Sequence, residues 1–379
     1  MVDQTDVRDV CCAALELSQT SWLLAFSPPG GGRVGTHKIK AGDVERLVGL
    51  LERQQAKAEQ EALRSLTTVL CYEVGYDGFW LARLLNGRGL RTVVFDPASF
   101  LLPRRGRLAK TDRLDAEGMT RTLRAWLGGD GRVVREVRIP TVEEEDAKRI
   151  ERERKHLVHQ RTRVIGRIKG LLALHGIRIA SKGVGKSLQA NLANLQTGDG
   201  RQLGPFLMRD VGRMLQHLKF INEQIAEAEA DRGRALTADS NSFPCRDRVK
   251  MLTGLDGIGE TTATTLVAEV YHRVFPTRRH VAAYMGLAPS QYASGAVSRD
   301  RGISKAGSKL ARTTVVELAW FWLRYQPASK LARWWHERFA DKGMRGRKVG
   351  IVALARKLAI ALWRFLEHGV VPEGATMKA

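Results

Sequence analysis

The first hundred residues alternate between short apolar blocks and polar breaks. Five of these blocks are apolar or β-branched and lie between turn residues such as Gly, Pro and Ser, which is typical of strands. The predicted strands cover residues 10–15, 22–26, 34–39, 67–72 and 92–95. The first three follow one another after short breaks, so they predict an antiparallel meander.

Helical spacing separates the later strands. Apolar residues recur every three or four positions in 42–63 and in about 79–85, and a further helix begins at Asp112. Three strands followed by helix, strand, helix, strand and helix is the order of a ribonuclease-H-like domain. Residues 1–135 are therefore predicted to form an α/β ribonuclease-H-like domain.

Two long helical patterns follow, at 141–175 and around 211–228. The first begins with three glutamates, which the helix dipole favours at a helix start, but its heptad positions include the charged Arg154 and Arg161. The second is a regular heptad made of Val211, Met214, Leu218, Ile221, Ile225 and Ala228. Residues 140–235 are predicted to be an α-helical, coiled-coil region, either a helical hairpin within one chain or a dimerising coiled coil.

The C-terminal region, 245–370, is predicted to be mainly α-helical, and the tail 371–379 to be disordered. Its Leu255-Asp256-Gly257-Ile258-Gly259 turn resembles that of a helix-hairpin-helix element. In such an element Gly257 and Gly259 would let the backbone approach a phosphate. An ordinary tight turn is the alternative. A loop rich in Ser, Gly and Arg is predicted at 290–301.

The charge of the chain narrows the choice of partner. Lys and Arg number 62 against 40 Asp and Glu, which leaves a net charge of +22. An excess of this size favours a polyanion, and nucleic acid above other polyanions. A soluble protein that is basic only by composition is the alternative.

Compartment signals are equally simple. No segment reaches the ~18 consecutive apolar residues of a membrane helix, and the acidic start lacks the layout of a signal peptide. The cysteines are Cys11, Cys12, Cys71 and Cys245. They show no C-x-x-C spacing, so they are predicted to be buried thiols in a reducing compartment. These features predict a cytoplasmic protein without a membrane partner.

Four acids fall where the predicted fold would gather them. Glu16 and Glu73 close two strands, whereas Asp112 and Asp115 share one face at the start of a helix. Repelling carboxylates in one cleft are costly unless a cation neutralises them, and Mg²⁺ prefers such oxygen ligands. The sequence therefore predicts a site for Mg²⁺ or Mn²⁺. The alternative is a set of solvated surface acids, with Asp112 capping its helix.

Two groups of cations lie near this chemistry. The first precedes the aspartates and consists of Arg104, Arg105, Arg107, Lys110 and Arg113. The second lies in and just after the predicted Ser/Gly/Arg loop and consists of Arg299, Arg301 and Lys305. Positive charge beside a carboxylate site suits a phosphate backbone brought to a metal, so both groups are predicted to bind nucleic acid.

Several motifs, read in order, resemble one known family over nearly the whole chain. They are Glu73-x-Gly75-Tyr76-Asp77, Lys110-Thr111-Asp112-Arg113-Leu114-Asp115-Ala116, Gly286-Leu287-Ala288-Pro289, Ser294-Gly295 and Ile303-Ser304-Lys305-x-Gly307. The sequence is similar in these respects to the IS110 family of bacterial insertion-sequence transposases.

The resemblance implies a RuvC-like N-terminal domain whose four-acid site would hold the metal through Glu16, Glu73, Asp112 and Asp115. It further implies a coiled-coil middle and a C-terminal transposase domain with Ser294 as the nucleophile. Members are DNA recombinases guided by a structured bridge RNA, so the expected partners are DNA, a guide RNA and further copies of this chain. A homodimer that assembles to a tetramer would bring two duplexes together. Glu16 departs from the Asp that is usual in the family.

Two rival functions remain. The first is a hydrolytic RuvC-like nuclease or Holliday-junction resolvase that uses metal-activated water and does not need Ser294. The second is an inactive nucleic-acid-binding protein whose metal site is impaired at Glu16. The net charge of +22 does not separate these readings from a recombinase.

Overall fold

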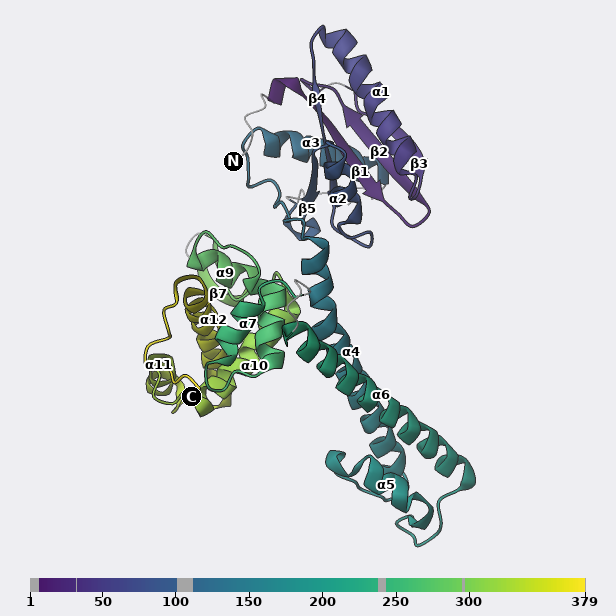
Figure 1. The fold of residues 1–379 in the computed structure, drawn as a ribbon, viewed down its shortest axis with the longest axis vertical. Coiled ribbons are helices and arrows are strands. Elements are labelled where there is room, and N and C mark those ends of the chain that lie inside the picture. Colours follow the sequence, from purple (N-terminus) through teal and green to yellow (C-terminus); the bar gives the residue numbers. More distant parts are fainter. Residues whose placement is uncertain (1–6, 32, 101–111, 238–242, 295–296, 379) are drawn as a thin grey trace. The chain divides into compact units, whose positions relative to one another are not determined.

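The computed structural model describes residues 7–31, 33–100, 112–237, 243–294 and 297–378, apart from the side chains of 290–301 (Figure 1). The chain divides into two compact units, Met1–Pro140 and Thr141–Ala379. No helix within the described ranges is long and apolar enough to cross a lipid bilayer.

Unit 1 is built on a five-stranded mixed sheet with the order β3-β2-β1-β4-β5. The strands are β1 (Val10–Leu17), β2 (Ser21–Ser27), β3 (Gly35–Lys40), β4 (Thr67–Glu73) and β5 (Thr92–Phe95). The first three pair antiparallel, as the predicted meander requires, whereas β1, β4 and β5 run parallel. Helices connect the parallel strands because such strands need a long crossover.

Helices cover both faces of this sheet. They are α1 (Val44–Ala62), α2 (Trp80–Gly87) and α3 (Asp112–Leu127), with short 3-10 turns at Val7–Asp9 and Pro97–Ser99. Leu15 and Leu70 share one apolar core with α1 and α2, whereas Cys12 and Cys71 share the other with α3. The predicted element order is therefore confirmed, and the arrangement is compatible with a ribonuclease-H-like domain.

Unit 2 begins with two long helices, α4 (Val142–Ala173) and α6 (Pro205–Thr237). They pack antiparallel, because Arg154 near the start of α4 pairs with Glu229 near the end of α6 at 2.7 Å. The six predicted heptad residues of α6 are all buried. The helices therefore form a helical hairpin within this chain, which was one of the two predicted arrangements.

The connector between these helices contributes to a small core of its own. It contains α5 (Lys186–Asn191) and the 3-10 turns Ser181–Gly183 and Leu192–Asn194. Val184 and Leu188 pack against the buried residues of α4 and α6 near the tip of the hairpin.

The rest of unit 2 is mainly helical, as predicted. Its elements are α7 (Arg246–Thr253), α8 (Glu260–Leu266), a π-helical turn (Val267–Tyr271), α9 (Arg278–Tyr284), β6 (Pro289–Ser294), β7 (Val297–Ile303), α10 (Lys309–Tyr325), α11 (Lys330–Phe339) and α12 (Met344–His368). One apolar core joins these helices, with Trp322 and Leu358 fully buried in it. Helices α7 and α8 flank the turn that contains Gly257 and Gly259.

Three expectations from the sequence were wrong. The predicted loop 290–301 forms much of a two-stranded antiparallel sheet, whose main-chain hydrogen bonds do not require apolar alternation in the sequence. The tail is ordered up to Lys378, since the Lys378 amide donates to Gly254 and the Thr376 amide donates to Gln326. Cys245 is exposed, whereas the other three cysteines are buried thiols.

Candidate functional site

Glu16 and Glu73 lie at neighbouring ends of two parallel strands. The register pairs Leu15 of β1 with Tyr72 of β4, so the next residues along each strand are Glu16 and Glu73. Adjacent strand backbones are about 4.8 Å apart, and residues in register in a parallel pair point to the same face. That face is the one covered by α3, because it also carries Cys12 and Cys71. Both glutamates are half-buried.

The direction of α3 brings its first turn toward the same end of the sheet. Arg124, near the end of the helix, donates to Ser27 Oγ at 2.8 Å and to the Pro28 carbonyl at 2.7 Å. Ser27 pairs with Cys12 near the start of β1, which is the opposite end from Glu16. Helix α3 therefore runs back along the sheet, so its first turn, with Asp112 and Asp115, points toward the Glu16 end.

The donor types suit Mg²⁺, which is commonly held by one or two carboxylates together with substrate phosphates. Two adjacent strand-end glutamates match that pattern. Within the described ranges, however, no three side chains of His, Cys, Asp or Glu are grouped closely enough to hold one ion. The strand register therefore brings Glu16 and Glu73 together, and Asp112 and Asp115 do not close a four-acid cage with them in this structure.

Sulfur is an unsuitable metal ligand on this face of the sheet. Burial raises the pKa of the Cys71 thiol well above its ordinary value, and the neighbouring Cys12 and Glu73 raise it further. Burial also raises the pKa of Cys12. Because a thiolate and not a thiol binds metals, these cysteines are packing residues at neutral pH.

The predicted basic run is only partly visible. Arg104, Arg105, Arg107 and Lys110 lie outside the described residues. Arg113 is exposed and pairs with Glu117 one helical turn away, at 2.8 Å. An exposed pair of this kind contributes little to stability, so the Arg113 guanidinium can exchange Glu117 for a phosphate at low cost.

Ser294 ends strand β6 and pairs with Val297 at the start of β7. Arg299 and Arg301 lie on β7, and the side chains of all three predicted site residues are outside the described part. Lys305 follows the hairpin, is exposed and has a left-handed backbone with φ of 58°. The two-stranded hairpin therefore carries the predicted nucleophile and two of the predicted cations.

The base of this hairpin is fixed by a close crossing of two chain segments. The Lys305 amide donates to the Gly286 carbonyl at 3.0 Å, and Arg312 Nη1 donates to the carbonyls of Met285 and Lys305 at 3.2 and 3.0 Å. A Cβ at Gly307, where φ is +101°, would lie 2.0 Å from the Tyr284 carbonyl oxygen. Glycine is therefore required where the hairpin leaves the helical body.

A buried carboxylate next to this crossing was not anticipated from the sequence. Glu269 lies in the π-helical turn and accepts from Arg152 Nε at 2.7 Å and Nη2 at 3.2 Å. It also accepts from Ser308 Oγ at 3.0 Å, and Ser308 caps α10 directly after the hairpin. π-helical turns are rare and occur often at functional sites. The signal in the sequence was a single acid within the apolar run 266–271.

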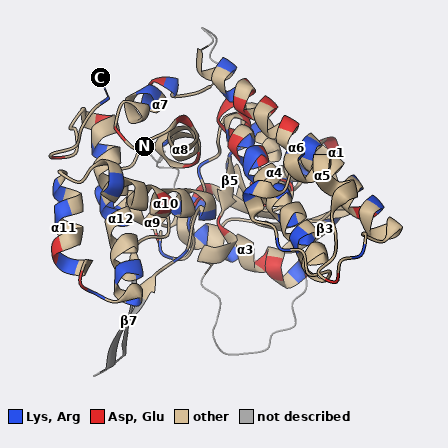
Figure 2. Cartoon of the chain, turned by 90° about the horizontal axis from the view of Figure 1, so that it is seen from below, with Lys and Arg blue, Asp and Glu red and all other residues tan. Residues whose placement is uncertain are grey.

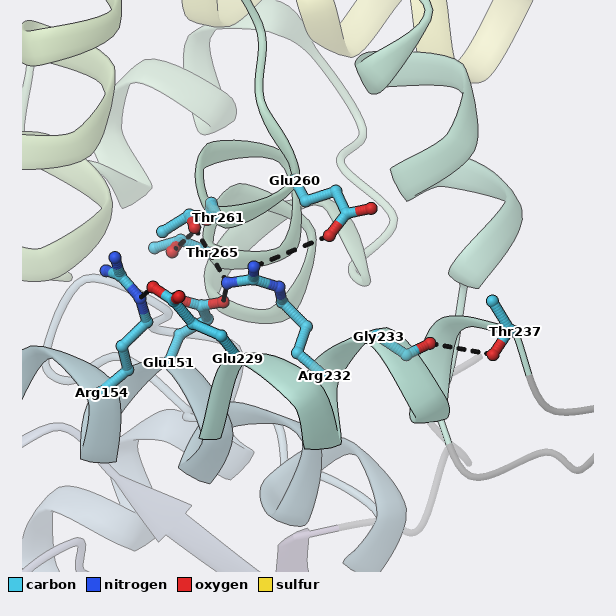
Figure 3. Close-up of polar contacts among 9 residues, drawn as sticks. All are labelled: Glu151, Arg154, Glu229, Arg232, Gly233, Thr237, Glu260, Thr261 and Thr265. Carbon is cyan, nitrogen blue, oxygen red and sulfur yellow. Dashed lines mark hydrogen bonds and ion pairs between the residues drawn. The ribbon is translucent and has the colours of Figure 1, made fainter. Parts of the chain in front are cut away.

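A second buried ion cluster joins the α4–α6 hairpin to α8 (Figure 3). The Arg232 guanidinium contacts Glu151 at 3.1 Å, Glu260 at 3.6 Å and Thr261 Oγ1 at 2.8 Å. Burial raises the pKa of Glu151, and the hydrogen bond from Arg232 opposes that rise. The first turn of α8 is thus tied to both long helices.

The turn before α8 was predicted to approach phosphate. Gly257 has φ of +80°, and a Cβ there would lie 2.8 Å from Tyr325 Cβ. Packing against α10 therefore accounts for Gly257. Gly259 is the N-cap of α8, and its missing Cβ faces open space. Phosphate binding at this turn stays a prediction.

Comparison with known proteins places the chain among transposases. Residues 249–333, which span the α7–α8 turn and the β6–β7 hairpin, match the family described as Transposase IS116/IS110/IS902 family. The chain is 41% identical over 372 residues to a putative transposase, y4rJ, of Sinorhizobium fredii, covering 96% of this chain and 94% of that protein.

More distant relatives are named for insertion sequences. The transposase for insertion sequence element IS1111A of Coxiella burnetii is 28% identical over 261 residues, covering 68% of this chain and 66% of that protein. An uncharacterised 43.6 kDa protein of insertion element IS110 from Streptomyces coelicolor is 28% identical over 142 residues, covering 37% and 34%. The resemblance drawn from the motifs is confirmed, and the chain belongs to the IS110/IS116/IS902 family of insertion-sequence transposases.

Proposed function

We propose that this transposase cuts and rejoins DNA with Mg²⁺ or Mn²⁺ held by its N-terminal acids and with Ser294 as the nucleophile. The observation that carries the proposal is the strand register that sets Glu16 beside Glu73, on the sheet face along which α3 directs Asp112 and Asp115. Membership of a transposase family indicates that the substrate is DNA.

Glu16 and Glu73 would provide the first ligands, and phosphate oxygens of bound DNA would complete the set together with Asp112 or Asp115. A divalent ion there supplies charge neutralisation at the scissile phosphate. Because Glu16 is one methylene longer than the usual Asp, a small shift of the backbone or of the metal would let its carboxylate serve as a ligand. The acids would hold the ion that contacts the phosphate, and they are not consumed.

The proposed chemical step conserves phosphoester bonds. The Ser294 hydroxyl oxygen forms a bond to phosphorus as the bond from phosphorus to the 3′ oxygen breaks. The serine proton is released, and the departing 3′ oxygen takes up a proton to become a hydroxyl. Attack of another 3′ hydroxyl on the phosphoserine reverses the exchange, so strands are joined without ATP. The close crossing at Gly286 and Gly307 would hold the hairpin steady during this exchange.

Guidance by a structured RNA and assembly into a dimer or tetramer belong to the same proposal. A net charge of +22 is compatible with binding both RNA and DNA. Specificity assigned to base pairing leaves protein contacts mainly to backbones. The heptad face of α6 is covered by α4 of the same chain, so a dimer would use another surface.

The decisive experiment replaces the nucleophile. Ser294→Ala should abolish the covalent adduct between protein and a DNA substrate nicked to trap it, measured on denaturing gels. Ser290→Ala, on the same strand, is the matched control and should keep the adduct. Adducts retained by Ser294→Ala would place the nucleophile elsewhere, and cleavage without any adduct in the unchanged chain would favour the hydrolytic nuclease.

A second experiment addresses the acids. Asp112→Asn with Asp115→Asn should remove Mg²⁺-dependent and Mn²⁺-dependent cleavage. The control is Glu52→Gln with Glu61→Gln, two exposed acids of α1 in the same unit. Undiminished cleavage by the aspartate variant would end the metal-site proposal. Absence of cleavage in every chain, with DNA binding intact, would favour an inactive nucleic-acid-binding protein.

A further inference from the structure

The turn between α11 and α12 concentrates positive charge. Residues 330–357 hold nine Lys or Arg against two acids, a net +7 in a chain of +22. Figure 2 shows this charge along α11 and α12. Six exposed side chains make up what is here named the α11–α12 cationic surface: Arg338, Lys342, Arg345, Arg347, Lys348 and Lys357.

Aromatic rings fix several of these cations in place. Lys357 Nζ lies 4.6 Å from the centroid of the Trp334 ring, and Arg338 Cζ lies 5.7 Å from the same centroid. Lys342 Nζ lies 5.5 Å from the Phe339 centroid. Trp334 and Phe339 pack edge to face at 5.8 Å. Such contacts hold long side chains in place and lower the entropy lost when they bind an anion.

The six cations of this surface lack ion-pair partners among the described residues. Within the described part of the chain, none of the six cations forms an ion pair with a carboxylate, although Lys330 nearby pairs with Glu373 at 2.7 Å. Arg347 Nε donates to the Lys342 carbonyl at 3.0 Å. The other N–H groups of this guanidinium can still donate to an anion. Cations without nearby carboxylates repel one another and destabilise the fold, so we expect an anionic partner that neutralises them.

From this geometry we infer that the α11–α12 cationic surface binds the phosphate backbone of duplex DNA. Single strands are bound mainly through open aromatic platforms for base stacking, and here both rings are partly buried and carry cations on their faces. Phosphate contacts position a duplex without reading its sequence. The inference rests on the proposed function only in taking DNA as the nucleic acid that the protein binds.

The test compares two variants of equal charge in the full chain that carries Ser294→Ala, so that no DNA is cut. The first variant is Arg338→Gln, Lys342→Gln, Arg345→Gln and Lys348→Gln. The control is Lys38→Gln, Lys40→Gln, Arg53→Gln and Lys57→Gln, four exposed cations of unit 1. The probe is a fluorescent 40-bp duplex of arbitrary sequence, and anisotropy is read across a series of salt concentrations.

We expect the first variant to weaken duplex binding at least tenfold at 0.1 M salt. The slope of log K against log salt should become shallower by roughly 3.6 if all four cations contact phosphates, because each lost phosphate contact removes about 0.9 from it. Arg338→Lys with Arg345→Lys should bind like the parent, because it keeps the charge. Thermal melting followed by circular dichroism checks that all variants remain folded.

Three results would overturn the inference. An equal loss in the control variant would mean that net charge alone matters. A loss for duplex RNA of the same length but not for DNA would assign the surface to RNA. A loss for anionic lipid vesicles alone would assign it to a membrane. None of these results depends on whether Ser294 forms an adduct, so failure here and failure of the proposed chemistry are distinguishable.

Discussion

The two units have different interiors. Among the described residues, the buried polar side chains of unit 1 are neutral, namely Ser27, Thr68, Thr92 and Thr120, and its buried thiols have raised pKa values. Unit 2 buries charged groups as well, namely Glu151, Arg232 and Glu269. The difference follows from how each unit fixes its parts.

Main-chain ladders set the relative positions of strands in unit 1, so side chains there need only fill space. Helices have no such ladder between them, and apolar helix faces can slide past one another. In unit 2 the ion pairs from Arg232 and Glu269 connect α4, α6, α8 and α10, which come from distant parts of the sequence. We infer that buried ion pairs fix the relative positions of the helices in unit 2, as strand register fixes those of the strands in unit 1.

Removal of the Arg232 guanidinium should have the largest effect. Arg232→Met leaves Glu151 buried without its cation, which typically costs about 3–5 kcal/mol. Urea unfolding followed by hydrogen exchange should show the loss in α4, α6 and α8, with the strands of unit 1 unchanged.

A double variant separates charge from packing. Arg232→Met with Glu151→Leu should recover most of the lost stability, because well-packed apolar residues can replace a buried ion pair. If the double variant is as unstable as the single one, loss of packing and not an unpaired charge explains the result. If stability is restored but the amides of α8 are less protected from hydrogen exchange, the Arg232–Glu151 pair serves to fix the position of α8 against the long helices.

The crossing at the hairpin base should come next. Gly307→Ala sets a Cβ 2.0 Å from the Tyr284 carbonyl at a positive φ, so a loss of about 3 kcal/mol is expected. Gly42→Ala in unit 1 is the control, since φ is +83° there but no atom lies within 4 Å. Its expected loss is only about 1–2 kcal/mol. Equal losses would show that backbone strain alone, and not the close crossing, accounts for Gly307.

Acid should weaken unit 2 selectively. Burial, together with the positive Lys148 and Arg273 and against the opposing charge of Glu144, lowers the pKa of His272 to about 4. As the pH falls, His272 therefore becomes protonated near pH 6.5 in the unfolded chain but only at about pH 4 in the folded chain. Stability is full above this window and falls by up to about 3 kcal/mol across it. His272→Gln should flatten the dependence in urea titrations.

Alkali should weaken unit 1 in turn. Burial, with Cys12 and Glu59 nearby, raises the pKa of Cys11 from 9.0 to about 11, so the thiol stays protonated when the unfolded chain has lost its proton. Stability is full below pH 9.0 and is lost as the pH rises toward about 11. Cys11→Ala should remove part of that slope. Opposite pH responses of the two units would confirm the contrast between their interiors.

The sequence predicted what is local and periodic. The strands and helices of unit 1 were recognisable from apolar spacing, because one buried face dictates the period of each element. The six heptad residues predicted in α6 are all buried, although Leu215 and Arg232 are buried as well. Arg154, which interrupted the pattern of α4, lies opposite Glu229, so the apparent defect was half of an ion pair.

Contacts between distant segments were not predictable from one sequence. Glu269 and Arg152 are separated by 117 positions, and nothing local connects them. The strands β6 and β7 lack apolar alternation in the sequence, yet their main chains pair through hydrogen bonds. The tail looked disordered by composition, yet Gln326 donates to the Thr376 carbonyl and accepts from its amide. For the candidate site, the four acids stay a prediction from the sequence, which could not give their spacing.

Loss of a helix cap should have the smallest effect, and the same one in both units. Thr141 Oγ1 accepts from the Glu144 amide at 3.1 Å, while the Thr141 amide donates to the Glu144 carboxylate at 3.1 Å. Thr141→Ala should cost about 1 kcal/mol and Thr141→Ser almost nothing. In unit 1, Asp43 caps α1 through the Arg46 amide at 3.0 Å, so Asp43→Ala should cost a similar amount. These cap hydrogen bonds are exposed to solvent, so the composition of each unit's interior should not change their contribution to stability. Urea unfolding measures both losses. If Thr141→Ala lowered the free energy of unfolding as much as Arg232→Met does, the stability of unit 2 would depend on its helix caps rather than on its buried charge.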